Sequence, residues 1–135
     1  MSISLKLEDM ETFDLIAQIC GRHQVYPPNP DPEWTGGIED FFRNLLSEYK
    51  GPLDKKSLAD YLDEHMAKSF IAYGERPRWI QSGLWPFHNE KPMIFVGQID
   101  IPKSVGKFHD DTSFYIFHPQ QPFSDDECVV IVQQY

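Results

Sequence analysis

The chain has few cysteines, no long apolar run and fewer basic than acidic residues. Its two cysteines, Cys20 and Cys128, lie far apart in apolar surroundings and form no CxxC pair, so we expect reduced, buried thiols. No apolar run approaches the roughly 18 residues that span a bilayer. Residues 1–13 lack the basic and apolar segments of a signal peptide. These absences together favour a cytoplasmic protein.

The common catalytic templates are also absent. The sequence contains no GxSxG, HExxH, P-loop or GxGxxG motif. Neither cysteine has an obvious base partner, which argues against a thiolate nucleophile. The acidic run Asp125–Glu127 precedes a predicted strand, where a solvated turn explains it better than general acid–base chemistry. We therefore predict no catalytic residue and no cofactor, and we favour a non-enzymatic protein.

The formal net charge is −9, from 12 basic and 21 acidic residues. An acidic surface repels nucleic-acid phosphates and anionic lipid headgroups, so we expect the chain to bind neither nucleic acid nor membrane. The same charge would speed association with a basic protein. The alternative is that the charge serves solubility alone.

Residues 1–75 have the apolar periodicity of about three helices, over 10–20, 38–49 and 54–74. Between the first two, the segment VYPPNPDPEWTGG (25–37) contains four prolines. Proline interrupts a helix, so we expect an extended loop there, with Trp34 as its one large anchor.

After Pro77 the apolar period changes from about 3.6 to 2, which predicts strands over 79–81, 93–101, 113–118 and 128–133. In the second of these, the set that should face the core is Met93, Phe95, Gly97, Ile99 and Ile101. Short links between the strands favour an antiparallel meander.

This order of elements indicates one α+β domain spanning 1–135, with a helical half (1–75) packed on the sheet of a β half (76–135). The C-terminal strand could form an exposed edge, so a homodimer through that edge is possible.

The best metal-like cluster in the sequence is weak. It consists of His109, Asp111 and His118, whose imidazoles and carboxylate could hold a divalent ion. Nine residues separate the two histidines, which on a strand places the rings far apart. Asp111 also suits a turn. His65 falls in the apolar stripe of the third predicted helix, where a packed histidine is the better interpretation. We therefore expect no metal site.

Aromatic and polar side chains near loops and strand ends are the remaining candidates for binding. Large rings at a surface can anchor a protein interface with an acidic rim, although each ring could instead belong to the core. The candidate partner-binding residues are Trp34, Trp79, Trp85, Phe87, His88 and Gln98.

Within 79–117 the sequence resembles the YwqG-like family of bacterial domains of unknown function. The resemblance rests on a Trp85-Pro86 element, the strand PMIFVGQIDIP (92–102), and paired aromatics in FYIF (114–117). It covers less than a third of the chain. Three helices occupy the N-terminal half here, whereas members of that family are usually longer and mostly β, with a Gly-Gly-x-Pro element that this chain lacks. The resemblance implies a sheet but supplies no catalytic residues.

Small domains of this appearance also occur among bacterial immunity proteins. The sequence thus leads to the hypothesis of a protein-binding module, an immunity-type protein that neutralises a basic toxin through an acidic, aromatic-rich face. The alternative is a small-ligand or metal-binding domain of unknown activity.

Overall fold

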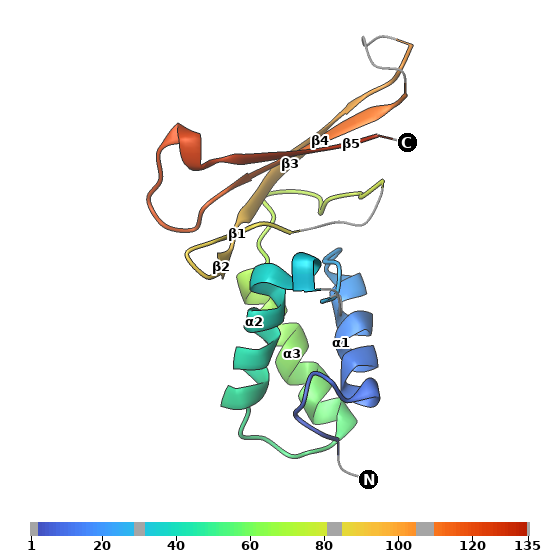
Figure 1. Cartoon of the computed structure of the whole chain (residues 1–135), viewed down its shortest axis with the longest axis vertical. Helices are drawn as coiled ribbons and strands as arrows, with labels where there is room; N and C mark the ends of the chain where they lie inside the picture. Colours follow the sequence, from blue (N-terminus) through green and yellow to red (C-terminus); the bar gives the residue numbers. More distant parts are fainter. Residues whose placement is uncertain (1–2, 29–31, 81–84, 105–109, 135) are drawn as a thin grey trace.

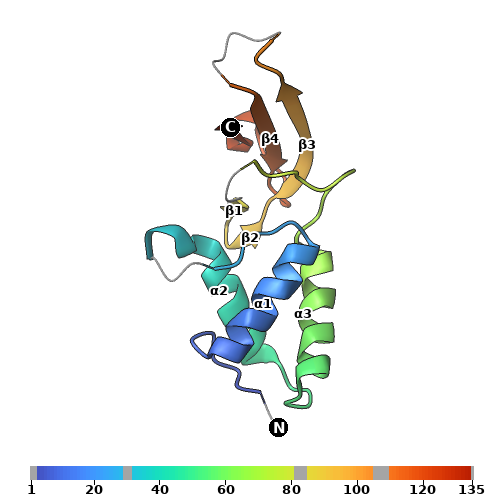
Figure 2. The same ribbon diagram turned by 90° about the vertical axis from the view of Figure 1, so that its right-hand side faces the viewer.

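The structure is a computed structural model that describes residues 3–28, 32–80, 85–104 and 110–134, with the side chains of 32–36 outside this description. Three helices precede an antiparallel sheet, which confirms the predicted α+β order. In both Figure 1 and Figure 2 the helices lie together at one end of the molecule, and β3 and β4 extend away from them.

The helices are α1 (Met10–Arg22), α2 (Pro32–Glu48) and α3 (Lys55–Ser69). The Asp9 carboxylate accepts the Glu11 N–H at the start of α1, and Asp54 accepts the Ser57 N–H at the start of α3. Both side chains satisfy N–H groups that a helix start leaves unpaired.

The prediction of an extended loop over 25–37 is wrong in its second part, because α2 begins at Pro32. Proline suits the first position of a helix, since its fixed φ is helical and its missing N–H is not needed there. Trp34 therefore belongs to a helix, and its side chain lies outside the described residues.

A two-stranded hairpin separates the helices from the main sheet. It joins β1 (Phe87–His88) to β2 (Lys91–Pro92) through Asn89 and Glu90, whose φ angles of 49° and 67° are left-handed. Two such residues in succession match the turn that best suits the twist of a hairpin.

The main sheet has the order β3-β4-β5 and is antiparallel throughout, as the meander prediction requires. Its strands are β3 (Ile94–Ile101), β4 (Thr112–His118) and β5 (Val129–Gln134). A 3₁₀ turn, Asp125–Glu127, precedes β5.

One core connects the helices to the sheet, and aromatic rings form the junction. Phe70, at the end of α3, lies edge-on to Phe41 of α2, to Phe87 and to Trp85. The Trp85 ring in turn contacts Phe117 of β4. The core cluster also includes aliphatic side chains of all three helices.

Two sequence predictions for the β half are wrong. Residues 79–80 belong to no strand (Gln81 lies outside the described residues), because the Ile80 N–H donates to side chains of β4 and β5 rather than to a neighbouring strand. Ile99, predicted to face the core, is 52% exposed, and Ile101 is only half-buried. Met93 and Phe95 are buried as predicted.

The cause of the second error is a β-bulge. Phe95 pairs with Phe117 and Gly97 with the next residue of β4, Ile116, so Val96 is an extra residue in β3. An extra residue exchanges the two faces for everything that follows it. Gln98 and Asp100 consequently lie on the inner face, and Ile99 lies on the outer face.

Candidate functional site

The inner face of the sheet is crossed by the segment 76–80, which follows α3 and is visible in yellow-green alongside the sheet in Figure 1. Its backbone binds side chains of the sheet. Gln98 Oε1 accepts the Arg78 N–H at 2.8 Å, and the Tyr115 hydroxyl donates to the Arg78 carbonyl at 2.8 Å. These bonds satisfy polar backbone groups in a segment that has no strand partner.

Trp79 is held in this segment from two sides. Its ring stacks on Tyr115 with centroids 4.5 Å apart, and its Nε1–H donates to the Gln24 carbonyl at 2.7 Å. Trp79 therefore fastens the segment both to β4 and to the end of α1, and the ring is half-buried.

Asp100 is the centre of a polar network beside this segment. Its carboxylate accepts hydrogen bonds from Ser113 Oγ at 2.6 Å, from Gln98 Nε2 at 2.7 Å and from Arg78 NH2 at 2.9 Å. The hydrogen bonds from Ser113 and Gln98, followed by that from Arg78, hold the pKa of Asp100 below its ordinary value. The carboxylate is thus charged at neutral pH and is a weak base.

These groups line an open cleft of about 390 Å³. The Asp111 carboxylate is also in its wall and accepts the Lys103 N–H at 2.9 Å. The lining combines hydrogen-bonding side chains with a few apolar surfaces, which suits binding of a polar or positively charged group. The lining residues are Arg78, Trp79, Ile80, Gln98, Asp100, Ile101, Pro102, Asp111, Thr112 and Ser113.

The structure brings two of the six predicted partner-binding residues together in this cleft, Trp79 and Gln98. Trp85 is only 2% exposed and donates its Nε1–H to the Met93 carbonyl, so this ring is part of the core, contrary to the expectation of a surface anchor. Phe87 is half-buried against the rings of Phe41 and Phe70. The Trp34 side chain lies outside the described residues.

His88, the sixth candidate, lies in β1, directly before the hairpin turn. Its Nε2 is 2.8 Å from Glu127 Oε2, and the ring is half-buried. Its Nδ1 is buried and has no hydrogen-bond partner among the described residues. The pair ties β1 to the 3₁₀ turn before β5.

Of the three weak metal candidates, the two described ones, Asp111 and His118, lie apart. Asp111 lines the cleft, whereas His118 lies at the far end of β4, where its Nε2 is 2.6 Å from the Tyr73 hydroxyl and its Nδ1 is 2.7 Å from the Pro119 carbonyl oxygen. His109 lies outside the described residues. Within the described ranges, no group of three or more potential ligands could hold a metal ion.

The cysteines are both free thiols, as predicted. Cys20 is buried, and burial raises the pKa of its thiol to about 12, which keeps it neutral. Cys128 is half-buried rather than buried.

Sequence reasoning missed Arg78, Asp100 and Ser113, which are the polar centre of the cleft. Each is an ordinary polar residue in a β-type sequence, and no motif marks them. The one signal is that Gln98 and Asp100 are two apart and so share a strand face, but regular alternation placed that face toward solvent.

Searches of protein-family models, of curated proteins and of solved structures find no match to this chain. Among the described residues, no helix has the length and apolar character needed to cross a membrane.

Proposed function

We propose that this chain is a non-enzymatic protein-binding module of the immunity type, which neutralises a basic toxin in the cytoplasm. The observation that supports the proposal best is the open cleft, where Trp79 and Gln98 lie beside carboxylates in a chain of net charge −9. The resemblance to YwqG-like domains belongs to the same proposal and rests on the sequence motifs alone.

The charges around the cleft favour a cationic partner. Glu75, whose side chain is 88% exposed, pairs with Arg78 at 3.0 Å, and Asp111 is exposed at the cleft wall. An exposed carboxylate keeps most of its hydration, so it can bind a lysine or arginine at small desolvation cost and can attract a basic protein over a distance.

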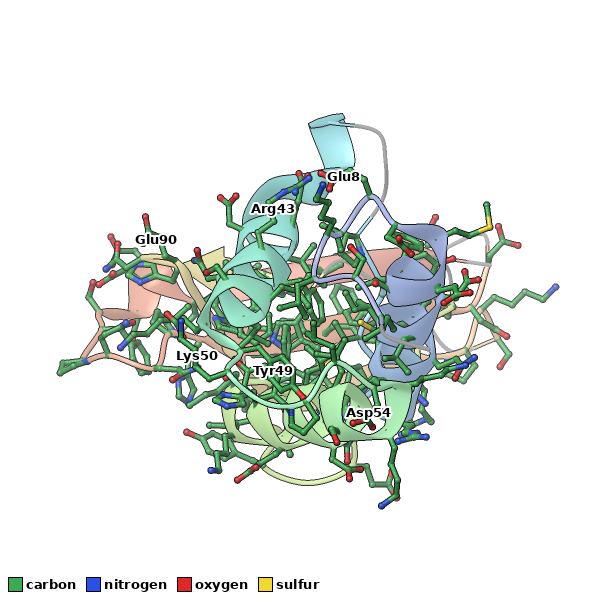
Figure 3. The ribbon with its side chains drawn as sticks, turned by 90° about the horizontal axis from the view of Figure 1, so that it is seen from below. Glu8, Arg43, Tyr49, Lys50, Asp54 and Glu90 are labelled. Carbon is green, nitrogen blue, oxygen red and sulfur yellow. The ribbon has the colours of Figure 1, made fainter. Side chains whose placement is uncertain are left out.

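The helical end of the molecule also carries an arginine between carboxylates. Figure 3 views it from below and shows Glu8 beside Arg43. Arg43 is 2.6 Å from Glu8 and 2.7 Å from Glu39, so both carboxylates have a cation within the chain. Arg78 pairs in the same way with Glu75 and Asp100 at the cleft, where the further carboxylate, Asp111, accepts the Lys103 N–H. Asp111 is therefore the group of the cleft that best suits a basic partner.

The chemistry of the cleft also favours binding over catalysis. The lowered pKa of Asp100 makes it a poor proton acceptor at neutral pH. The Ser113 hydroxyl donates a hydrogen bond to that same carboxylate. This bond positions the hydroxyl but does not activate it as a nucleophile.

A capture experiment from lysate of the native host, at about 50 mM and about 500 mM salt, tests the proposal, since screening weakens an exposed charge contact. We expect the double variant Glu75→Gln/Asp111→Asn to lose most of the low-salt capture. The matched control Asp14→Asn/Glu48→Gln removes the same two charges from exposed positions of α1 and α2 and should retain it. Recovery of no protein at either salt concentration, or equal loss in both variants, would contradict the proposal.

The volume of the cleft supports a second candidate, a small-ligand-binding domain. About 390 Å³ lies within the usual range for small-molecule sites. Native mass spectrometry of untagged protein distinguishes the two, because a stoichiometric small molecule that is lost in Gln98→Ala would favour the ligand.

A further inference from the structure

Tyr73 and His118 form a pair of side chains outside both the cleft and the core. The Tyr73 hydroxyl oxygen lies 2.6 Å from His118 Nε2, although the two residues are 45 positions apart in the sequence. Tyr73 is 62% exposed, and His118 is half-buried. A hydroxyl within hydrogen-bond distance of a base, with the base oriented by a third group, is the arrangement that activates a nucleophile.

The third group is a backbone carbonyl, which determines the tautomer of the histidine. His118 Nδ1 lies 2.7 Å from the Pro119 carbonyl oxygen. A carbonyl oxygen only accepts hydrogen bonds, so we assign the proton to Nδ1, and Nε2 of the neutral ring then carries a free lone pair. The Tyr73 hydroxyl therefore donates to Nε2. A phenol that donates to a base is a better nucleophile than one that donates to water.

Backbone pairing with β3 holds both residues in place. His118, the last residue of β4, is opposite Ile94. The Tyr73 N–H donates to the Phe95 carbonyl at 3.0 Å, and the Phe95 N–H donates to the Ile71 carbonyl at 2.8 Å. Because both backbones are attached to the same strand, the hydroxyl and the imidazole meet with little further loss of conformational freedom.

The pair is accessible to a small molecule and has an aromatic ring beside it. A Cβ built on Gly74, which follows Tyr73, would meet no described atom within 4 Å apart from its chain neighbours. The Phe123 ring stacks on His118 with centroids 4.6 Å apart, and Phe123 is 41% exposed. A reagent can therefore reach the hydroxyl from solvent, and a flat apolar group can pack on a ring next to it.

The charges favour a neutral electrophile over an anionic one. Among the described residues, no lysine or arginine forms a hydrogen bond or an ion pair with Tyr73 or His118. Phosphoryl transfer depends on such cations to neutralise the charge of the transferred group. The net charge of −9 also repels an anionic donor. A neutral ester needs no cation and meets no repulsion.

We propose that Tyr73 is a site of covalent acylation, in which His118 is the base and the acyl donor is a neutral ester with a good leaving group. The Tyr73 oxygen forms a bond to the acyl carbonyl carbon, and the bond between that carbon and the leaving group breaks. The leaving group departs with the electron pair of that bond. The phenolic proton passes to His118 Nε2, and the imidazolium then releases it to water.

This site is separate from the proposed partner-binding cleft. The cleft is lined by Thr112 and Ser113 at the start of β4, whereas His118 is at the end of that strand. The product is a modified chain, so the proposal requires no turnover. Failure of either proposal therefore leaves the other unaffected.

Tyr26 is a matched control within the same chain. It is 48% exposed, and it forms no hydrogen bond with any described residue. Exposure alone predicts similar reactivity of the Tyr26 and Tyr73 phenols, whereas the base beside Tyr73 predicts a faster reaction there.

Acetylation of the full chain by p-nitrophenyl acetate tests the proposal, with the rate at each tyrosine measured by peptide mass spectrometry at about pH 7.5, where imidazole is mostly neutral. We expect Tyr73 to react at least about tenfold faster than Tyr26, because general base assistance is typically larger than this. His118→Phe keeps a ring against Phe123 but has no base, so it should reduce the rate at Tyr73 to about that at Tyr26. Tyr73→Phe should remove the first product and leave the second unchanged.

Circular dichroism verifies that each variant is folded, and the comparison of Tyr73 with Tyr26 in the wild type needs no variant. Equal rates at these two tyrosines, or an unchanged rate at Tyr73 in the folded His118→Phe variant, would overturn the proposal. p-Nitrophenyl phosphate carries the same leaving group on an anionic phosphoryl group and should yield no phosphotyrosine. A faster reaction with the phosphate than with the acetate would overturn the choice of an acyl donor.

Discussion

Asp100 shows how one residue acquires its properties from its neighbours. Three side chains donate hydrogen bonds to its carboxylate, and they come from the segment 76–80, from β3 and from β4. The residue is about half exposed, so solvent screens part of these interactions. Its environment nevertheless favours the charged form.

Replacing Ser113 with alanine should raise the pKa of Asp100 toward its ordinary value, because the hydrogen bond from Ser113 is the largest cause of the lowering. A carboxyl group whose pKa is lowered on folding stabilises the protein at pH values above its ordinary, unfolded-state pKa. That contribution is lost as the pH falls through the pKa of the folded state. The stability difference between wild type and variant should therefore be largest at neutral pH and shrink in acid. Carbon-13 NMR titration of the Asp100 carboxyl measures the shift directly. Ser47→Ala, which removes a hydroxyl that donates only to the Asn44 carbonyl, should leave it unchanged.

Gly37 is required by its contact with the hairpin. A Cβ at this position would lie 2.6 Å from Cγ of Phe87, a ring held in the aromatic junction. Gly21, in α1, would meet nothing within 4 Å. Both glycines lie in helices, so Gly21 is a matched control for a substitution at Gly37.

We expect Gly37→Ala to destabilise the protein by about 1–2 kcal/mol, since overpacking outweighs the gain of about 0.5–1 kcal/mol from replacing a helical glycine. Gly21→Ala should be neutral or stabilising by up to about 1 kcal/mol. Urea unfolding of both variants gives the comparison. Equal effects in the two would show that helix propensity, and not contact with Phe87, dominates at Gly37.

At the scale of elements, the bulge in β3 is the feature that creates the cleft. A regular strand with this sequence would place Phe95 and Ile99 on one face. The extra residue, Val96, allows Phe95 to face the core while Gln98 and Asp100 reach the inner face farther along. The backbone of the segment 76–80 can then form hydrogen bonds with these side chains, as the Arg78 N–H does with Gln98 Oε1.

A pair of deletions tests this account. Deleting Val96 should convert β3 into a regular strand with the same cross-strand partners, so the fold and the lowered pKa of Asp100 should persist. Deleting Ile99 removes a residue beyond the bulge and places either Gln98 or Asp100 on the wrong face. We expect that variant to lose stability and the low pKa, as shown by thermal unfolding and NMR titration. Persistence of both properties in the Ile99 deletion would contradict the account.

At the scale of the whole molecule, the aromatic junction joins the helical half to the β half. Phe41 and Phe70 come from helices, Phe117 comes from the sheet, and Trp85 contacts both Phe70 and Phe117. Among the described residues, the buried apolar side chains form one cluster, which includes members of every helix and of β3 and β4.

We therefore predict that residues 1–75 and 76–135 unfold together in one cooperative transition. Far-ultraviolet circular dichroism reports chiefly on the helices, and tryptophan fluorescence reports largely on Trp79 and Trp85 in the β half. The two denaturation curves should coincide. Separate transitions would show two independent units. Trp85→Phe, which keeps a ring but loses the hydrogen bond to Met93, should lower the midpoint of both curves equally.

The sequence alone was sufficient for the helices, the antiparallel meander and the α+β class, because apolar periodicity is a local property of each element. It also indicated free thiols, and it singled out Trp79 and Gln98. The start of α2 at Pro32 was missed because proline suits a first helical turn as well as a loop.

Only the tertiary structure decided which side chains share a site. The cleft depends on hydrogen bonds between residues 13 to 37 positions apart, and on one unpaired residue in β3 that exchanges its faces. The same bulge turns Ile99 outward, where its side chain is 52% exposed. The local sequence pattern does not show which face of the sheet each residue of β3 occupies after the bulge, because that is set by pairing with a distant strand.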